Sequence, residues 1–171
     1  MSDDELVEQI RRGDTAAAEE LVRRHYAPVL RYCRNMCGSG ERAEDLAQET
    51  FLRLFRSLAG YVGRGKFRAF LYTIADHLCA DERRRRRPAP LEDGERLPDP
   101  RDRLRQAEDR AEIDRLLAPL TPEQRRAVIL RYGEQLTFRE IGQVTGCSLR
   151  TAQGRVRSAL QIMRRVWNDE R

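Results

Sequence analysis

Residues 43–58 read AEDLAQETFLRLFRSL, and this stretch decides the fold. On a helical period of about 3.6 residues, one side forms an apolar stripe suited to a domain core, made of Ala43, Ala47, Thr50, Phe51, Leu54, Phe55 and Leu58. The opposite side carries polar groups around one apolar side chain, namely Asp45, Gln48, Glu49, Leu52 and Arg56. An exposed leucine in a ring of charge is typical of a docking surface, although a solvated face with a single apolar residue has the same pattern.

The composition indicates folded helices. Charged residues make up 36% of the 171 residues, but the hydrophobic 40% falls at helical spacings, which is not expected of a disordered chain. This length holds one ordinary domain or two small ones. The net charge of +5 favours a polyanionic partner without identifying it.

The N-terminus is acidic, and no apolar run approaches the ~18 residues that a membrane span requires. We therefore expect no signal peptide, no membrane insertion and a cytoplasmic protein. The four cysteines, Cys33, Cys37, Cys79 and Cys147, are expected to be small buried residues in a reducing compartment. The alternative is a metal site in which Cys33 and Cys37 are joined by His25 or His77.

The first part of the chain predicts four helices, of which the second runs from Thr15 to about Cys37 and the third is the opening stretch. A glycine-punctuated loop from Gly60 to Lys66 then carries a ring and cations. The fourth helix begins near Phe67, and its outer side is predicted to carry Arg68, Tyr72, Thr73, Asp76 and His77. It ends in five consecutive arginines, 83–87. Together with the loop, this run predicts a track for phosphates, although arginine runs are often only solubilising.

Prolines and acidic residues then mark a linker between two helical units. Pro88, Pro90, Pro98 and Pro100 rule out a continuous helix there. The predicted division is a first domain at 1–87, an extended acidic linker at 88–104 and a second domain at 105–171.

The second unit carries the signature of a helix-turn-helix. Capping boxes are predicted at 121–124 and 137–140. Gly142 is expected to admit a crossing helix, and Gly146 to permit a left-handed turn.

The last helix of the second unit has two different faces. Its inner side is expected to comprise Leu149, Ala152, Val156, Ala159, Leu160, Met163 and Trp167. Its outer side carries Arg150, Gln153, Gly154, Arg157, Ser158 and Gln161. A basic, amide-bearing face of this kind suits the major groove of DNA, and the alternative is a surface helix of a small bundle.

With these pieces placed, the chain resembles the extracytoplasmic-function (ECF) group of bacterial RNA polymerase sigma factors, in the sigma-70 family. Three segments carry the resemblance: AEDLAQETFLRLF at 43–55, FRAFLYTIADHLCADERRRRR at 67–87, and residues 117–157, which include LTPEQRRAVILRY and LTFREIGQVTGCSLRTAQGRVR. The resemblance covers nearly the whole chain. It implies an all-α fold of two small helical domains, sigma regions 2 and 4, joined by a flexible linker.

The resemblance also implies a role for each face. Docking on the clamp coiled coil of core RNA polymerase would fall to Asp45, Gln48, Glu49, Leu52 and Arg56. The separated non-template strand of the −10 promoter element would be held by Tyr61, Arg64, Lys66, Phe67, Arg68, Tyr72 and His77, with a flipped base stacked on Tyr61 or Phe67. In the −35 duplex, base contacts would come from Gln153, Gly154, Arg157 and Ser158, and phosphate contacts from Arg150, Thr151 and Arg155. In the linker, the carboxylates of Glu92, Asp93, Glu95 and Asp99 would mimic nucleic acid in the polymerase channel.

The implied partners are core RNA polymerase, through its clamp coiled coil and its flap, and promoter DNA in double- and single-stranded form. An anti-sigma factor is a further partner that the linker would permit. The resemblance implies no cofactor, no metal and no catalysis.

Two other classes of function stay open at this stage. A stand-alone helix-turn-helix regulator would need only the second unit and leaves the outer face of the 43–58 helix unexplained. A metal-dependent hydrolase using His25, His77 and the cysteines is the other, but neither paired carboxylates nor a ligand spacing supports it.

Overall fold

The structure is a computed structural model that describes residues 1–38, 41–86 and 100–171, with only the backbone described for 100–107. The regular secondary structure of the described residues is entirely helical, with no strand among them, which confirms the all-α prediction. The elements are α1 (Asp3–Arg11), α2 (Thr15–Cys37), α3 (Glu41–Ser57), η1 (Leu58–Gly60), α4 (Phe67–Arg85), α5 (Pro100–Leu117), α6 (Pro122–Val128), η2 (Ile129–Gly133), α7 (Phe138–Thr145) and α8 (Leu149–Asp169).

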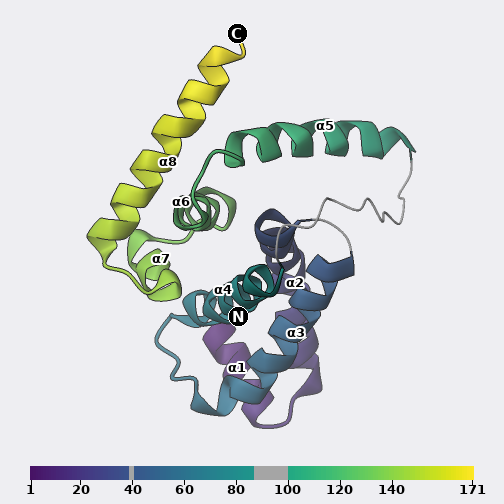
Figure 1. Cartoon of the computed structure of the whole chain (residues 1–171). Helices are drawn as coiled ribbons and strands as arrows, with labels where there is room; N and C mark the ends of the chain where they lie inside the picture. The colour runs from purple at the N-terminus through teal and green to yellow at the C-terminus, as the bar shows by residue number, and fades with distance from the viewer. Residues whose placement is uncertain (39–40, 87–99) are drawn as a thin grey trace.

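The first unit is a bundle of α1–α4 in which α2 packs against the other three helices and α3 also packs on α4 (Figure 1). The first two helices are capped by side chains at their N-terminal ends. Ser2 and Glu5 form a capping box on α1, and the Asp14 carboxylate accepts the N–H groups of the first turn of α2. The stripe on α3 faces the core with Ala43, Leu46, Ala47, Thr50, Phe51 and Leu54 buried. Leu46 was not in the predicted stripe, and Phe55, which was, is only partly buried.

The second unit is built from α5–α8, and its helix-turn-helix consists of α7, a short turn and α8. Both predicted capping boxes are present, at Thr121 and Thr137. Gly146 has φ of 70°, as the left-handed turn requires. A Cβ on Gly142 would lie 2.6 Å from the Cys147 carbonyl oxygen. The close neighbour of Gly142 is therefore the backbone of the turn and not a crossing helix.

The inner face predicted for α8 is only partly correct. Ala152, Val156 and Ala159 are buried, whereas Leu149 and Trp167 are 42% and 41% exposed. For Trp167, Figure 1 is consistent with this exposure, since the C-terminal half of α8 extends beyond α6 and α7, which pack on its first half. Near its end, Glu170 pairs with Arg115 of α5 at 3.6 Å and the Arg171 guanidinium lies over the Trp167 ring.

The predicted linker is only partly within the described residues. Its acidic residues Glu92, Asp93, Glu95 and Asp99 lie outside them. The expectation of an extended chain through 104 was wrong at its end, because α5 begins at Pro100. Proline is tolerated at a first helical position, where its missing N–H would have had no partner.

The two units pack directly on each other. Helix α7 lies against α4 (Figure 1). The η2 segment lies against α2. As a result the predicted outer side of α4 is not outer throughout, and Tyr72 and Asp76 are 1% and 0% exposed. The helical period identified this face correctly, but it cannot distinguish solvent from a second unit of the same chain.

Candidate protein and nucleic-acid interfaces

The outer face of α3 is the first candidate interface. Asp45, Gln48, Leu52 and Arg56 are exposed, and Leu52 keeps 52% of its surface accessible. Glu49 is partly buried and accepts a hydrogen bond from Arg53 at 3.2 Å (Nε to Oε1). An exposed leucine surrounded by groups of both charges has the composition of a small protein-docking patch. The predicted docking residues therefore lie together on one accessible surface.

The loop that follows α3 presents its cations but not its rings. Arg64 and Lys66 are exposed, whereas Tyr61 and Phe67 are 5% and 2% exposed. The Tyr61 hydroxyl donates to Asp4 Oδ1 at 2.5 Å. Burial and this hydrogen bond raise the pKa of Tyr61. Neither ring is available for stacking while the loop keeps this conformation.

Helix α1 holds the loop in place through its backbone as well. The Gly65 N–H donates to Asp4 Oδ2 at 2.7 Å. Arg11 donates to the carbonyl of Leu58 at 2.6 Å (Nη2 to O) and to the carbonyl of Tyr61. The sequence alone did not predict these hydrogen bonds between α1 and the loop, because they join residues that are more than forty positions apart.

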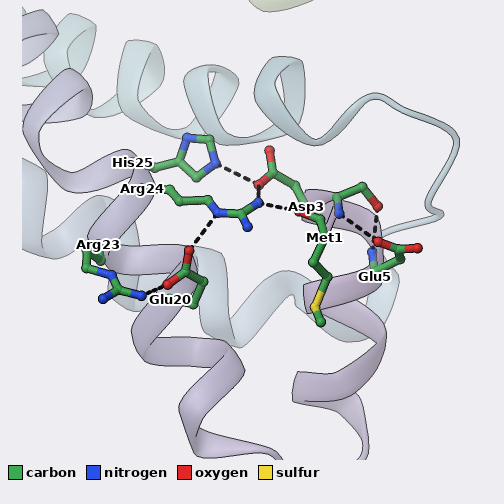
Figure 2. A network of polar contacts seen from close by, with 8 residues as sticks. Met1, Asp3, Glu5, Glu20, Arg23, Arg24 and His25 are labelled. Atoms are coloured by element: carbon green, nitrogen blue, oxygen red, sulfur yellow. Dashed lines mark hydrogen bonds and ion pairs between the residues drawn. The ribbon is translucent and has the colours of Figure 1, made fainter.

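A polar network fixes α1 to α2 (Figure 2). His25 Nε2 lies 3.0 Å from Asp3 Oδ1, and Arg24 Nη1 lies 3.4 Å from the same oxygen. Arg24 also pairs with Glu20 at 2.9 Å (Nε to Oε1) and donates to the Met1 carbonyl at 2.7 Å. The hydrogen bond with His25 lowers the pKa of Asp3, against the opposing effect of burial and with help from the charges of His25 and Arg24. This network positions Asp4, and through it the loop.

The α4 face divides into an accessible and a covered part. His77 is exposed, and Arg68 is partly buried and donates to the Glu134 carbonyl. The Tyr72 hydroxyl donates to Glu134 Oε2 at 2.7 Å. Of the residues predicted for the −10 strand, the structure thus leaves Arg64, Lys66 and His77 exposed.

Helix α8 brings together all the residues predicted for the −35 duplex. Arg150, Thr151, Gln153, Gly154 and Arg157 are exposed, and Arg155 and Ser158 are partly buried. A Cβ on Gly154 would have no atom within 4 Å. This stretch of backbone is therefore open to close approach by a ligand.

The start of α8 is also well ordered by its own side chains. Ser148 caps the helix by accepting the Thr151 N–H at 3.1 Å, and its hydroxyl donates to Thr151 Oγ1 at 2.9 Å. The N-terminal turn that would enter a groove is thereby fixed.

Two buried carboxylates lie where the units meet, and sequence reasoning assigned a role to neither. Asp76 accepts the Tyr32 hydroxyl at 2.6 Å and the guanidinium of Arg126 at 2.8 and 2.5 Å. Glu134 accepts Arg31 at 3.2 Å (Nη2 to Oε2) in addition to Tyr72. No local sequence pattern predicts these contacts, because each one joins residues that are far apart in the sequence.

The cysteines do not form a metal site in the part of the chain that the structure describes, where no cluster of three His, Cys, Asp or Glu side chains occurs. Cys33 and Cys79 are buried, and Cys37 and Cys147 are partly buried. Hydrogen bonding to Cys79 and burial raise the pKa of Cys37. Hydrogen bonding to Cys33 and burial raise the pKa of Cys79, against the opposing effect of its bond with Cys37. Protonated thiols are poor nucleophiles and poor metal ligands.

Comparison with known proteins agrees with this geometry. The family model for sigma-70 region 2 matches residues 21–89, and the model for sigma-70 region 4 matches residues 110–163. The ECF RNA polymerase sigma factor ShbA of Streptomyces griseus is 34% identical over 95% of this chain and 98% of its own length. The ECF RNA polymerase sigma factor SigE of Mycolicibacterium smegmatis is 38% identical over 89% of this chain, which spans 63% of that relative.

Two solved structures share the fold. CnrH, in complex with the cytosolic domain of CnrY, has a TM-score of 0.80 and 22% identity, with 99% of each chain covered. The sigma factor RpoE of Bartonella quintana, in complex with the anti-sigma factor NepR, has a TM-score of 0.67 and 17% identity over 90% of this chain and 98% of its own.

These matches define a transcription initiation factor rather than an enzyme. The chain belongs to the sigma-70 family of RNA polymerase sigma factors, in its ECF group. The resemblance stated from the sequence is thereby confirmed. Among the described helices, none combines the length and the apolar character needed to cross a membrane.

Proposed function

We propose that this chain gives core RNA polymerase its choice of promoter by dividing the work between its two units. The first unit docks on the clamp coiled coil through α3 and holds the melted −10 strand with the loop at 61–66 and the adjacent face of α4. The second unit contacts the flap and reads the −35 duplex with α8. The chain acts where the polymerase acts, in the cytoplasm.

One observation carries the proposal: two accessible recognition faces, on α3 and on α8, lie on separate units of a single chain. A stand-alone regulator would account for α8 alone. The exposed outer face of α3 around Leu52 and the cationic loop that follows α3 would then be unexplained. A sigma factor needs both faces, since it must bind a protein machine and DNA at the same time.

The −35 contact is supported by side-chain chemistry on α8. Arginine and glutamine are the side chains that bond bidentately to guanine and adenine edges in the major groove, and Arg157 and Gln153 are both exposed. The open backbone at Gly154 lets the helix come close to the bases. Arg150 and Arg155 flank this row and suit phosphates.

The −10 contact is supported by the exposed cations Arg64 and Lys66 and by His77. The buried rings require a further step. Tyr61 would have to leave Asp4 of α1, Phe67 its contacts with His25 and Tyr61, and Tyr72 its bond to Glu134, before a flipped base could stack on them. Single-strand capture is therefore proposed to follow a rearrangement of this surface.

An anti-sigma factor is proposed as a regulatory partner. RpoE of Bartonella quintana was solved with such a factor, and CnrH with the cytosolic domain of CnrY. Both share this fold, so a partner that wraps the packed units is compatible with it.

Run-off transcription with purified core polymerase over a promoter library tests the function. We expect transcripts from new start sites only when the protein is added, and a shared sequence element upstream of them. Duplex binding as tight without polymerase as with it, and no new start site, would favour the stand-alone regulator instead. The double substitution Asp45→Ala and Leu52→Ala should abolish the new transcripts without unfolding the protein.

A further inference from the structure

We propose that the loop between α3 and α4 contains a phosphate-binding site, and that Asp4 of α1 occupies this site in the free protein. The site consists of the Tyr61 hydroxyl and the Gly65 N–H, with the cations Arg64 and Lys66 on the same loop. Its ligand is a phosphodiester group of single-stranded DNA, which takes the place of the Asp4 carboxylate. The choice of DNA as the ligand rests on the proposed function, whereas the site itself follows from the contacts of the loop.

The Asp4 carboxylate is held in the way that a bound anion is held. Its Oδ1 accepts the Tyr61 hydroxyl at 2.5 Å, and its Oδ2 accepts the Gly65 N–H at 2.7 Å. A Cβ on Gly63 would lie 3.3 Å from Asp4 Cγ, so the backbone of the loop also approaches the carboxylate closely. A phosphate group presents anionic oxygens of the same kind and can accept from the same two donors.

Both donors are also held by contacts that do not involve the carboxylate. The Tyr61 ring packs on Phe67 and Phe70, with ring centroids 6.0 and 5.0 Å away. Arg11 donates to the Tyr61 carbonyl and so fixes the start of the loop to α1. Gly65 has φ of 69°, and turns with a left-handed residue commonly present their N–H groups to anions. The site therefore keeps its shape when the carboxylate leaves.

The charge of the loop favours a strand over a single anion. Arg64 and Lys66 are exposed, and no ion pair among the described residues includes either of them. A phosphodiester carries the same single charge as the carboxylate that it replaces. A strand also brings the neighbouring phosphates to these two cations, which the carboxylate cannot do. A strand is therefore a better ligand for the loop than Asp4, and an isolated phosphate is not.

Asp4 thus acts as a competitor that is built into α1. The preceding residue, Asp3, pairs with His25 and Arg24 of α2 (Figure 2), so the helix that carries the competitor stays in place. Any occupancy of the site by Asp4 lowers the apparent affinity for the strand by the fraction of molecules that are free to bind. Displacement of Asp4 also frees Tyr61 from α1, which the proposed function requires before a base can stack on that ring.

The test removes the carboxylate and leaves the loop unchanged. In Asp4→Asn the side chain has one acceptor oxygen instead of two, so it cannot accept from both donors. Asp4→Ala removes both acceptors and provides a second variant. The control is Asp109→Asn, which makes the same change of charge at an exposed position on α5. Circular dichroism should show the same helix content for all four proteins.

The first measurement is the affinity for short single-stranded oligonucleotides of random sequence. We expect both Asp4 variants to bind them about tenfold more tightly than wild type, as for a site that Asp4 occupies in about nine-tenths of the molecules. The same oligonucleotides with an uncharged methylphosphonate backbone should show no gain. Asp109→Asn should match wild type with both backbones.

The second measurement follows the Gly65 amide by nuclear magnetic resonance. The probe is inorganic phosphate, with sodium chloride at the same ionic strength as the reference. We expect phosphate to shift the Gly65 amide resonance in Asp4→Asn and in Asp4→Ala. It should leave this resonance unchanged in wild type and in Asp109→Asn, where the carboxylate of Asp4 is present.

The outcomes separate the inference from the proposed function. Wild-type affinity in both Asp4 variants overturns the inference, and so does a Gly65 resonance that phosphate does not shift in either of them. An equal gain with the methylphosphonate backbone also overturns it, because Asp4 would then shield a base pocket and not a phosphate site. The expected results support the inference even if core polymerase starts no transcript with any of the proteins, a result that would contradict the proposed function alone.

Discussion

The substitution Leu52→Ala tests the docking face most directly. Fully burying a leucine side chain contributes about 1.5–3 kcal/mol, and Leu52 is 52% exposed in the free protein. Docking can therefore bury about half of that surface, which corresponds to about 0.8–1.5 kcal/mol. We expect the dissociation constant for core polymerase to rise about fourfold to twelvefold.

The stability of the free protein should hardly change, because the lost atoms contact mostly water. Exposed positions of this kind usually change the free energy of unfolding by less than about 0.5 kcal/mol. The assay is a titration of fluorescently labelled protein with core polymerase, together with thermal unfolding of each variant. A loss of binding that is matched by a loss of stability would point to a folding defect.

Ile113→Ala is the matched control, since Ile113 is also a large apolar side chain and is 46% exposed, but on α5 of the second unit. We expect it to leave the affinity for core polymerase unchanged. If Leu52→Ala binds as tightly as wild type, or if Ile113→Ala weakens binding equally, the docking face has been placed incorrectly.

Four further predictions concern the helix-turn-helix and the N-terminal network. Gly142→Ala should destabilise the second unit by about 1–3 kcal/mol in thermal unfolding, because the new Cβ would meet the Cys147 carbonyl at 2.6 Å. In Gly154→Ala the added Cβ has no atom within 4 Å, so this substitution should stabilise α8 by about 0.5–1 kcal/mol. It should nevertheless weaken binding to the −35 duplex. A gain in stability with unchanged DNA affinity would show that bases do not approach there. Arg157→Ala should cost about 1–3 kcal/mol at one −35 base pair, and an equal loss on all DNA sequences in a binding titration would make it a phosphate contact. The pKa of Asp3 lies below its usual 3.8 in the folded state. Its carboxylate therefore stabilises the fold above about pH 4, and this contribution disappears as the pH falls through the lowered pKa. The difference in unfolding free energy between wild type and Asp3→Asn should shrink over that range, and a constant difference would refute the assignment.

The helices and their ends could be predicted because their causes are local. The caps at Ser2, Thr121 and Thr137 involve residues three positions apart, and the left-handed turn at Gly146 depends on one residue. The two faces of α3 follow from the helical period alone. Each of these features is complete within a few residues, so a single sequence contains the whole signal.

The state of the surface proposed for the −10 strand could not be predicted, because it depends on distant partners. Tyr61 looks like a stacking platform in a glycine-rich loop, but Asp4 and Arg11 of α1 hold its hydroxyl and its carbonyl. Tyr72 lies on a polar face of α4, but Glu134 of the second unit covers it. Periodicity shows that a side chain points away from its own core and says nothing of what meets it there.

The ambiguity of the α4 face has a physical reason that bears on function. A face that is covered in the free protein and is proposed to meet DNA in the complex cannot be apolar, because an apolar face would hold the units together and would be costly to expose. It cannot be ordinary solvent-facing surface either, because unpaired charges would be costly to bury. Tyr72 and Asp76 meet both demands: their oxygens are hydrogen-bonded when the units are closed and would be hydrated when the units part. Replacing Tyr72 and Asp76 by leucine should weaken the contact between the units, because Glu134 would lose a hydrogen-bond donor and the Arg126 guanidinium would be left buried without its carboxylate. A thermal unfolding midpoint that does not fall in this variant would refute the reasoning.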